Sequence, residues 1–295
     1  MPALQHRVGL ALRSRVAGND APEVAERIWG AEGERWFTSA DPIWRVNENA
    51  AMFPGGLAAL LLQSLHPSAM AGVAGHSGYK GDPWGRLQRT SHYLAVTTYG
   101  TVADAEAAIA HVRSVHRFVR GTDERGRPYA ADDPHLLRWV HVAEIWCFLN
   151  AFQAYAEAPL SPAEADLFVE QTARAATRLG ATELPMTVQQ LDDVIEGYRP
   201  ELEATAAARE ATRFMLLNPP IPWVARPGYA LIAAGGVALL PTWARSALGL
   251  PVNRAGIAVA SRAGGLSTAL VRWGMAGLRD RAPAEEPTAE EESAG

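Results

Sequence analysis

The run from His135 to Ala156 (HLLRWVHVAEIWCFLNAFQAYA) constrains the fold most, because it is apolar on nearly every side when drawn as a helix. A helix with no polar face is stable only when other elements surround it. Asp132-Asp133-Pro134 precedes the run and supplies an N-cap acid and a proline for the first turn. We therefore expect a central helix enclosed by further helices.

Helix-start signals recur along the rest of the chain. One helix start is marked by Asp20, followed by Pro22. Two apolar helical patterns begin at a proline, Pro54 and Pro67. A capping box is formed by Ser161-Pro162-Ala163-Glu164. There is no run of alternating strands and no repeat of fixed period. The sequence predicts an all-α fold in one domain of ten to twelve helices over residues 1–280. Residues 281–295 are acidic and lack large apolar side chains, so we expect a disordered tail.

Composition excludes several classes of protein. The 295 residues suffice for a large core, and a net charge of -5 without a basic stripe argues against nucleic-acid binding. The sequence contains no GxGxxG after a strand, no GxxxxGK[ST], no GxSxG and no HExxH. Cys147 is the only cysteine, which excludes a disulfide framework, and its apolar surroundings predict a buried, inert thiol.

Two segments bear on location. The first twenty residues lack the continuous apolar stretch of a secretory signal, so we expect a cytoplasmic protein. The most apolar segment, Tyr229 to Leu240, is shorter than the roughly 20 residues that span a bilayer. We interpret it as a buried helix or one that touches a membrane surface.

A helix predicted over Thr101 to Arg120, with Gly121 at its C-terminal cap, carries an unusual group of residues. One side of it is apolar, and His116 falls on that side, one turn beyond Val112. Arg113 and Arg120 border the same stripe, three residues before and four residues after the histidine. The other members of the apolar side are Val102, Ala105, Ile109, Val115 and Val119.

Three interpretations of this group stay open at the level of the residues. His116 can be a core histidine whose ring nitrogens are satisfied by neighbours. The arginines can pair with Glu106 and Glu144, since a buried arginine usually has an anionic partner. Alternatively, an inward imidazole between two arginines suits haem b, whose iron takes an imidazole and whose two propionates lie at one edge.

Polar residues on the preceding segments are further candidates. Arg86 and Thr90 are four apart and share a helix face, where the Thr90 hydroxyl can bond back to the Arg86 carbonyl or point at a ligand. Gln63, His66 and His76 interrupt a helical pair rich in glycine and alanine. Such small residues permit close approach of a second helix or of a flat ligand.

His141 and Glu144 lie three apart on the central helix and so share one face. Di-iron carboxylate bundles use Glu-x-x-His pairs on two helices, but the order here is reversed and there is no second pair. We therefore interpret His141 and Glu144 as a structural, hydrogen-bonded pair.

Taken together, several motifs resemble the MpaB-type oxygenases, which are related to the bacterial latex-clearing protein, a rubber oxygenase. The resemblance covers roughly residues 40–255. The motifs are GGLAALLLQSLHP, HSGYKGDPWGRLQRT, YGT, VRSVHRFVRG, DPHLLRWVH and NPPIPWVARPGYALIAAGGVALLPTWARSALGLP.

The resemblance implies a globin-like helical core around a haem b pocket and an oxygenase that uses O₂ on an apolar, often isoprenoid, substrate. It implies His116 as the iron ligand and Arg113 and Arg120 as partners of the propionates. The family's distal RxxxT element matches Arg86 and Thr90.

The sequence departs from the rubber-cleaving members at two places. Arg89 stands where some of them carry a lysine that ligates iron, and a protonated arginine is a poor ligand. No acid before Asp82 matches their distal glutamate; the stretch offers His66 and His76 instead.

Three hypotheses follow. In the first, a haem b oxygenase binds iron through His116, and Arg86, Thr90 and either His66 or His76 act on bound O₂ at the opposite face. The second is a non-haem metal oxidase that uses some of His66, His76, His116, His141 and Glu144. The third is a helical protein that binds an apolar ligand or touches a membrane through residues 223–243, which include Trp223 and Trp243.

Overall fold

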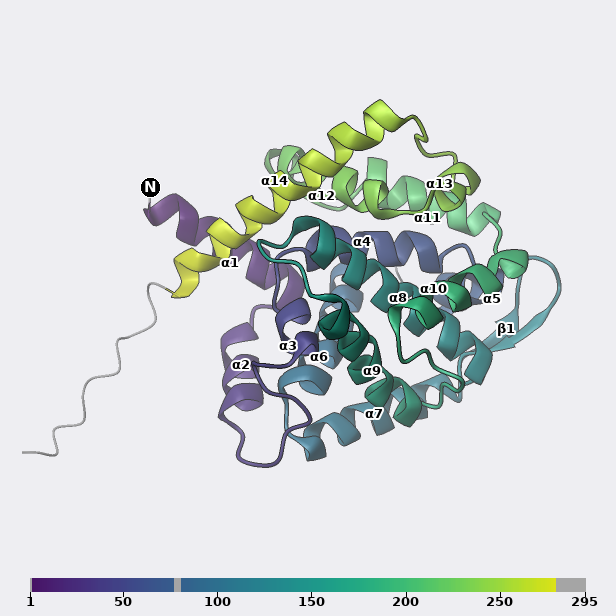
Figure 1. Ribbon diagram of the computed structural model, residues 1–295, viewed down its shortest axis with the longest axis horizontal. Helices are drawn as coiled ribbons and strands as arrows, with labels where there is room; N and C mark the ends of the chain where they lie inside the picture. Colours follow the sequence, from purple (N-terminus) through teal and green to yellow (C-terminus); the bar gives the residue numbers. More distant parts are fainter. Residues whose placement is uncertain (1, 77–80, 280–295) are drawn as a thin grey trace, which may run out of the picture.

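A computed structural model describes residues 2–76 and 81–279 (Figure 1). The α-helices within these ranges are α1 (Pro2–Ala17), α2 (Ala21–Gly30), α3 (Pro42–Asn47), α4 (Met52–Gln63), α5 (Pro67–His76), α6 (Pro83–Tyr99), α7 (Val102–His116), α8 (Pro134–Tyr155), α9 (Pro162–Leu179), α10 (Val188–Gly197), α11 (Ala206–Leu217), α12 (Arg226–Leu239), α13 (Thr242–Ala247) and α14 (Arg254–Arg279). The remaining elements are two 3₁₀ helices, η1 (Arg199–Glu201) and η2 (Trp223–Ala225), and two strands, β1 (Arg120–Thr122) and β2 (Pro128–Ala130).

The all-α prediction is confirmed, but the predicted number of helices was too low. The described ranges hold fourteen α-helices, because α1, α3 and α13 are short or weakly patterned segments that carry few start signals. The predicted tail, 281–295, lies outside the described residues.

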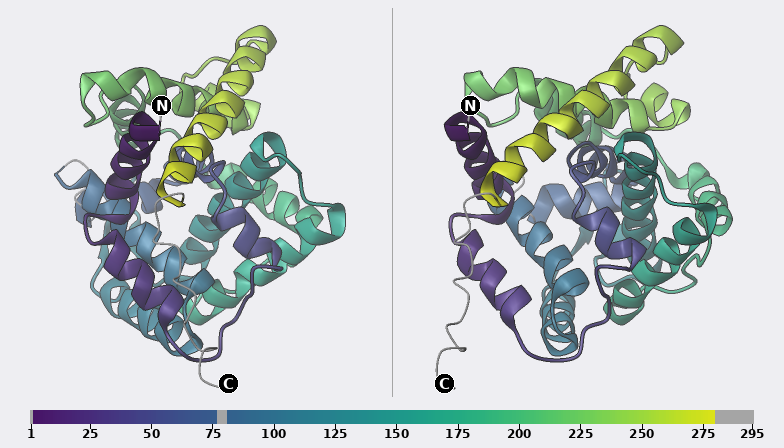
Figure 2. Two further views of the ribbon diagram at one scale, coloured as in Figure 1. Left: turned by 90° about the vertical axis from the view of Figure 1, so that its left-hand side faces the viewer. Right: turned by 60° about the vertical axis from the view of Figure 1, so that its left-hand side comes forward.

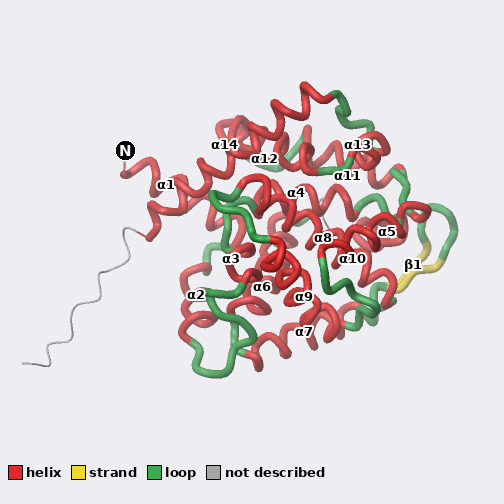
Figure 3. The backbone as a smooth tube through the Cα atoms, viewed as in Figure 1, coloured by secondary structure: helices red, strands yellow, loops and turns green. Residues whose placement is uncertain are grey.

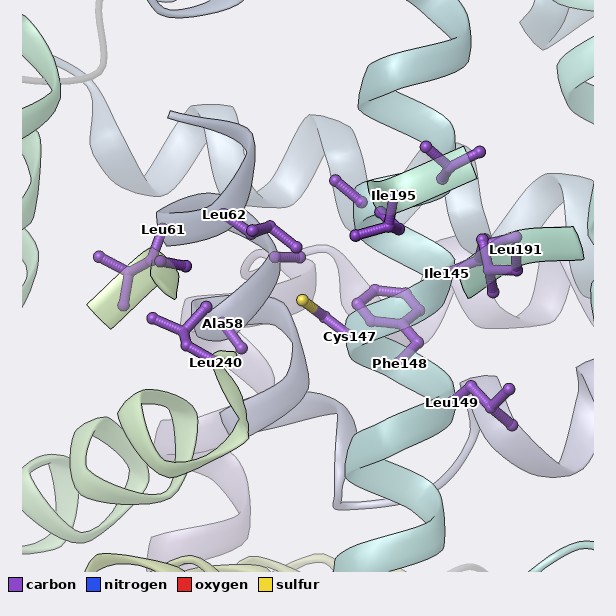
Figure 4. Close-up of a cluster of buried hydrophobic side chains, with 14 of the residues drawn as sticks. Ala58, Leu61, Leu62, Ile145, Cys147, Phe148, Leu149, Leu191, Ile195 and Leu240 are labelled. Atoms are coloured by element: carbon purple, nitrogen blue, oxygen red, sulfur yellow. The ribbon is translucent and has the colours of Figure 1, made fainter. Parts of the chain in front are cut away.

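The helix α8 is the centre of the core, as its apolar sequence predicts. It packs along α4 on one side and against α9 and α10 on others. Figure 4 shows Leu61 and Leu62 of α4 and Ile195 of α10 gathered around Cys147 and Phe148 of α8. Because α8 has neighbours on several sides, most of its apolar residues are removed from water, which is the main source of stability in such a fold.

The predicted helix starts before α8 and α9 are confirmed in detail. The Asp133 side chain accepts a hydrogen bond from the backbone N–H of His135 at 2.9 Å. Ser161 and Glu164 form the full capping box, and Glu164 also pairs with Arg45 of α3. Such caps satisfy donors that the first helical turn leaves free and fix where the helix begins.

A second layer is formed by the C-terminal helices and α1. Figures 1 and 2 show α14 lying across α12 at one end and alongside α1 at the other. The crossing of α12 and α14 is close because glycines meet there: a Cβ on Gly235 would lie 2.5 Å from the Gly264 Cα. Only glycine permits such a backbone approach.

The prediction of a helix through Arg120 was wrong. The helix α7 ends at His116, and β1 and β2 then form an antiparallel hairpin, with Arg120 opposite Ala130 (Figure 3). The hairpin turn is fixed by Asp123, whose carboxylate accepts from the N–H groups of Arg125 and Arg127, and by Gly126 at φ 77°. An aspartate followed three residues later by glycine is a hairpin signal.

The earlier end of α7 also changes its apolar side. Val115, predicted to face inward, is 47% exposed. Ile109 and Ala105, further toward the start of the helix, are buried as expected. The apolar stripe therefore packs only along the first turns of α7, and His116 lies where the chain leaves the helix.

Candidate functional site

The helices α6 and α7 are joined by a short connection and pack against one another. Only Gly100 and Thr101 separate the two helices, and Thr101 caps α7 by accepting from the Asp104 N–H at 3.2 Å. The predicted proximal residue His116 and the predicted distal residues Arg86 and Thr90 therefore lie on two helices that are in contact.

His116 is partly buried, and its Nδ1 atom is buried with no hydrogen-bond partner among the described residues. Burial lowers the pKa of His116 below its usual value, and the nearby Asp132 carboxylate acts in the opposite direction. The imidazole is therefore neutral near pH 7. A neutral imidazole with a free lone pair is the form that binds a metal ion.

The two arginines beside His116 differ in their surroundings. Arg120, now in β1, holds the Asp132 carboxylate at 2.8 Å and donates from Nε to the Arg117 carbonyl. Arg113 is exposed and has no ion-pair partner in the described part of the chain. The hairpin, and not a helical turn, therefore places Arg120.

The expected pairing of these arginines with Glu106 or Glu144 was wrong. Glu106 instead lies 3.6 Å from Arg178 of α9. Within the described ranges Glu144 makes no ion pair at all.

The first half of α6 presents Arg86, Thr90 and Tyr93 on one face, at positions i, i+4 and i+7. Of the two options for the Thr90 hydroxyl, the structure has the back-bond: it donates to the Arg86 carbonyl at 3.1 Å. Its oxygen lone pairs can still accept. Arg89 lies off this face and pairs with Asp82 at 3.2 Å.

His141 and Glu144 of α8 are not the hydrogen-bonded pair that the sequence suggested. The His141 Nε2 atom is buried without a partner, and no hydrogen bond involves Glu144 among the described residues. Burial alone lowers the pKa of His141 to about 4 and raises that of Glu144 to about 7. Both groups are consequently uncharged in mildly acidic solution, although neither side chain is completely inaccessible.

Glu144 connects α8 with the α6 face described above. Tyr93 of α6 is close enough for the Glu144 carboxylate to add to the effect of burial and raise the pKa of the phenol. Sequence reasoning gave Tyr93 no role. The available signal was its spacing of three residues from Thr90 and seven from Arg86.

His76 ends α5 and is exposed, with Nε2 3.2 Å from the Arg120 carbonyl oxygen. Gly72 and Gly75 of the same helix lie against the Tyr129 ring of β2, so these small residues serve packing between α5 and the hairpin. His76 is therefore beside the strand that carries Arg120, at the same end of the molecule as His116.

His66 lies in a different group of residues. It is buried in the turn between α4 and α5, with its ring near Trp139, His135 and Tyr198. Burial lowers the pKa of His66, and the nearby Glu201 carboxylate opposes that effect. Its contacts are with α5, α8 and the segment around η1, so a distal role for His66 gains no support from its surroundings.

Two other predictions concern buried residues. Gln63 donates to the Val140 carbonyl at 2.8 Å, which ties α4 to α8. Cys147 is fully buried, and burial together with Glu144 raises the pKa of its thiol, as expected for an inert cysteine.

In the described ranges no single helix is both long and apolar enough to cross a membrane. The helices α4 and α5 meet that requirement only as a pair, and they are bent by 107° at their junction.

Comparison with known proteins identifies a family to which this sequence is similar. Residues 44–273 match the family described as "ER-bound oxygenase mpaB/B'/Rubber oxygenase, catalytic domain". Two relatives, the uncharacterized proteins Rv2237 of Mycobacterium tuberculosis and Mb2261 of Mycobacterium bovis, are each 30% identical over 146 residues. That stretch covers 49% of this chain and 57% of either relative. No solved structure matches the chain significantly.

The family match extends over most of the described chain and includes α6, α7 and α8, which carry the candidate site. The chain belongs to the MpaB and rubber oxygenase family, in its catalytic domain.

Proposed function

We propose that the protein is a haem-b-dependent oxygenase that acts with O₂ on an apolar, isoprenoid-like substrate. The single observation that carries this proposal is His116, a neutral imidazole whose buried Nδ1 lacks a partner at the end of α7. Membership of an oxygenase family supports the reaction class.

The residues around His116 fit haem b. An imidazole nitrogen is the commonest protein ligand for haem iron, and the unpartnered ring of His116 can supply it. The exposed Arg113 can bind one propionate. Arg120 can bind the other, because its guanidinium has five N–H donors and Asp132 occupies only part of them.

Haem supplies the oxygen chemistry when it is bound, and the protein positions the haem and the substrate and tunes the reactivity of the haem. Arg86 and Thr90 present polar groups from the paired helix α6, where they can orient a bound oxygen species or a water molecule. His76 is the histidine that the fold leaves at this end of the molecule, beside β1. It is the better candidate than His66 for a polar group near O₂.

Glu144 is the group best suited to exchange a proton during the reaction. Its pKa of about 7 allows the carboxyl group to hold or accept a proton near neutral pH. Tyr93 shares the α6 face with Thr90 and feels the charge of Glu144, so its hydroxyl is the candidate to pass a proton between the carboxyl group and that face.

The test is a visible spectrum of the purified, haem-supplemented protein. We expect a Soret band, its shift on dithionite reduction, and stoichiometric haem after gel filtration. His116→Ala should lose the spectral features of histidine ligation, and its affinity for haem should fall at least tenfold. The matched control is His111→Ala, an exposed histidine on the same helix. A colourless wild-type protein, or identical spectra for wild type and His116→Ala, would refute the assignment.

We also propose that the segment around η2 contacts a membrane surface from which an apolar substrate is taken. Trp223 is 81% exposed and Val224 is 65% exposed, whereas α12 behind them is packed on α4 and α14. Exposed tryptophan beside aliphatic residues is typical of segments that enter the membrane interface. Of the region 223–243 that the sequence offered for membrane contact, this proposal uses only the first residues, around η2.

A further inference from the structure

Three segments that are distant in the sequence meet at one point on the surface beside α8. His66 belongs to the turn between α4 and α5, His135 to the first turn of α8, and Glu201 to the end of η1. No motif or spacing in the sequence connects them. Their side chains are brought together only by the packing of α4, α8 and α10.

The three groups are arranged as ligands around a common centre. Glu201 Oε2 lies 2.9 Å from His135 Nε2 and 3.6 Å from His66 Nε2. All three ligand atoms lie within 4.8 Å of one another. Ligands about 2.0–2.1 Å from a tetrahedral zinc ion are separated by about 3.3 Å, and the two separations from Glu201 lie on either side of that value.

His66 contributes an imidazole nitrogen that is otherwise unused. Its side chain is only 6% exposed, and Nε2 is buried with no hydrogen-bond partner, because the Glu201 oxygen at 3.6 Å is too distant. A buried polar atom without a partner is costly and calls for a ligand or ion. The Ala69 N–H donates to Nδ1 at 3.4 Å, so metal binding through Nε2, with the proton on Nδ1, requires this long contact to be given up.

His135 is held by a neighbour of the kind that metal-binding histidines have. The Tyr198 oxygen is 3.4 Å from His135 Nδ1, and the Tyr198 hydroxyl donates to the His135 carbonyl at 2.8 Å. The two rings are 4.7 Å apart between centroids. Such support on the second ring nitrogen orients a histidine so that the first can bind a metal ion.

The surrounding charges leave room for a cation. Arg127 acts electrostatically on His66 and Arg138 lines the cleft beside His135, and each has its own acid, Asp123 at 2.8 Å and Glu183 at 3.1 Å. His135 and Glu201 also line a surface cleft of about 320 Å³. An ion bound by the three residues would therefore keep one coordination position open to solvent or to a small ligand.

We propose that His66, His135 and Glu201 form a binding site for a divalent transition-metal ion, with zinc as the best-fitting ion. Two imidazoles and one carboxylate are a zinc ligand set, with water or a small ligand in the fourth position. Magnesium and calcium prefer oxygen ligands only, so they do not suit this site. Bound zinc ties the α4–α5 turn to α8 and η1.

This site is separate from His116 and does not depend on the proposed haem. The two can be tested independently: His116→Ala should leave zinc binding unchanged, and His135→Ala should leave the Soret band unchanged. A loss of haem in His116→Ala would therefore say nothing against zinc, and a lack of zinc binding nothing against haem.

The experiment uses the full chain, stripped with a chelator and titrated with zinc chloride by calorimetry, followed by elemental analysis after dialysis. We expect one zinc ion per chain. His135→Ala and Glu201→Gln should each weaken binding at least tenfold, whereas His92→Ala, an exposed histidine on α6, should not. Equal affinity in all four proteins, or no stoichiometric zinc in the wild type, would overturn the proposal.

A second measurement covers loss of folding in a variant. His135 and Glu201 are both partly exposed, and circular dichroism checks each variant before titration. Zinc at about a hundred times its dissociation constant should raise the thermal midpoint of the wild type by roughly 5 °C or more. The same zinc concentration should leave the midpoint of His135→Ala unchanged; an equal rise in both would exclude this site.

Discussion

Tyr93 of α6 and Glu144 of α8 are electrostatic neighbours across the interior of the molecule. Neither helix packs extensively on the other, and the Glu144 carboxylate acts through its charge on Tyr93, which shares a face of α6 with Arg86 and Thr90. His141 lies one turn before Glu144, without any hydrogen-bond partner on its Nε2. The titration of these two buried groups leads to opposite effects of pH on stability.

We predict that Glu144→Gln makes the protein less stable at pH 5 than at pH 7. The pKa of Glu144 is about 7 in the folded protein and 4.5 for an ordinary glutamate. Protonated Glu144 therefore favours folding of the wild type at low pH, and this contribution to stability is lost as pH rises. The Glu144 contribution changes by about 2 kcal/mol between pH 5 and pH 7. Without the Glu144 contribution, the effect of His141 remains, and that effect makes the free energy of unfolding fall as pH falls. Urea unfolding at both pH values measures the change.

The control for this variant is Glu106→Gln, which alters an exposed carboxylate paired with Arg178 and should keep the wild-type pH profile. A profile of Glu144→Gln that coincides with the control would mean that Glu144 is not protonated near neutrality.

We predict the reverse slope for His141→Leu. The pKa of His141 is about 4 in the folded protein and 6.5 for an ordinary histidine. As pH falls, the unfolded chain therefore binds a proton at His141 that the folded protein does not take up. Wild type therefore loses about 2 kcal/mol from His141 between pH 7 and pH 5, which nearly cancels the gain from Glu144. Relative to wild type, His141→Leu should gain that amount of stability at pH 5 over pH 7. The double variant should return to the wild-type pH profile, to which His66 and His116 also contribute, and a double variant that departs from that profile would contradict the pairing of the two effects.

We predict that Trp223→Ala weakens binding to phosphatidylcholine vesicles. The indole is almost fully exposed, and its insertion at the interface buries apolar surface that water otherwise contacts. A co-sedimentation assay should show a loss of about tenfold in partition, corresponding to about 1.4 kcal/mol. Phe118→Ala is the matched control, because Phe118 is 84% exposed but lies beyond the end of α7. Equal losses in the two variants would indicate unspecific adsorption.

We predict that Gly264→Ala destabilises the fold while Gly265→Ala does not. A Cβ at Gly264 would lie 2.5 Å from the Tyr155 ring and 2.8 Å from the Gly235 Cα, so α14 must move away from α12 and α8. Overpacking of this kind costs about 1–3 kcal/mol. At Gly265 nothing lies within 4 Å, and alanine in a helix interior is better than glycine by roughly 0.5–1 kcal/mol. A lower thermal midpoint for Gly264→Ala and a higher one for Gly265→Ala would support the close crossing of α12 and α14.

The helices with strong local signals could be predicted from the sequence. The acid–proline start and all-round apolar pattern of α8 are local features, as is the capping box of α9. The end of α7 could not be placed, because the periodicity continues through Val119 while the chain has already turned into β1. Hydrogen bonds of the Asp123 turn outweigh helix propensity there.

The candidate site divides in the same way. His116 was recognisable because an imidazole on an apolar stripe is a conflict within one helix. The group of His66, His135 and Glu201 was not, because its members belong to separate segments and only His66 interrupts a local pattern. His141 and Glu144 were noticed, but the partners they lack can only be seen in three dimensions.

The packing of α1 on α14 has a consequence for how the protein is made. Gln5 donates to the Trp273 carbonyl at 2.8 Å, and Gly9 lies against the backbone at Gly274. Nearly all of the described chain is synthesised between these two helices, at about 5–20 residues per second. On the ribosome, α1 therefore waits many seconds before α14 emerges and the packing between the two helices can form.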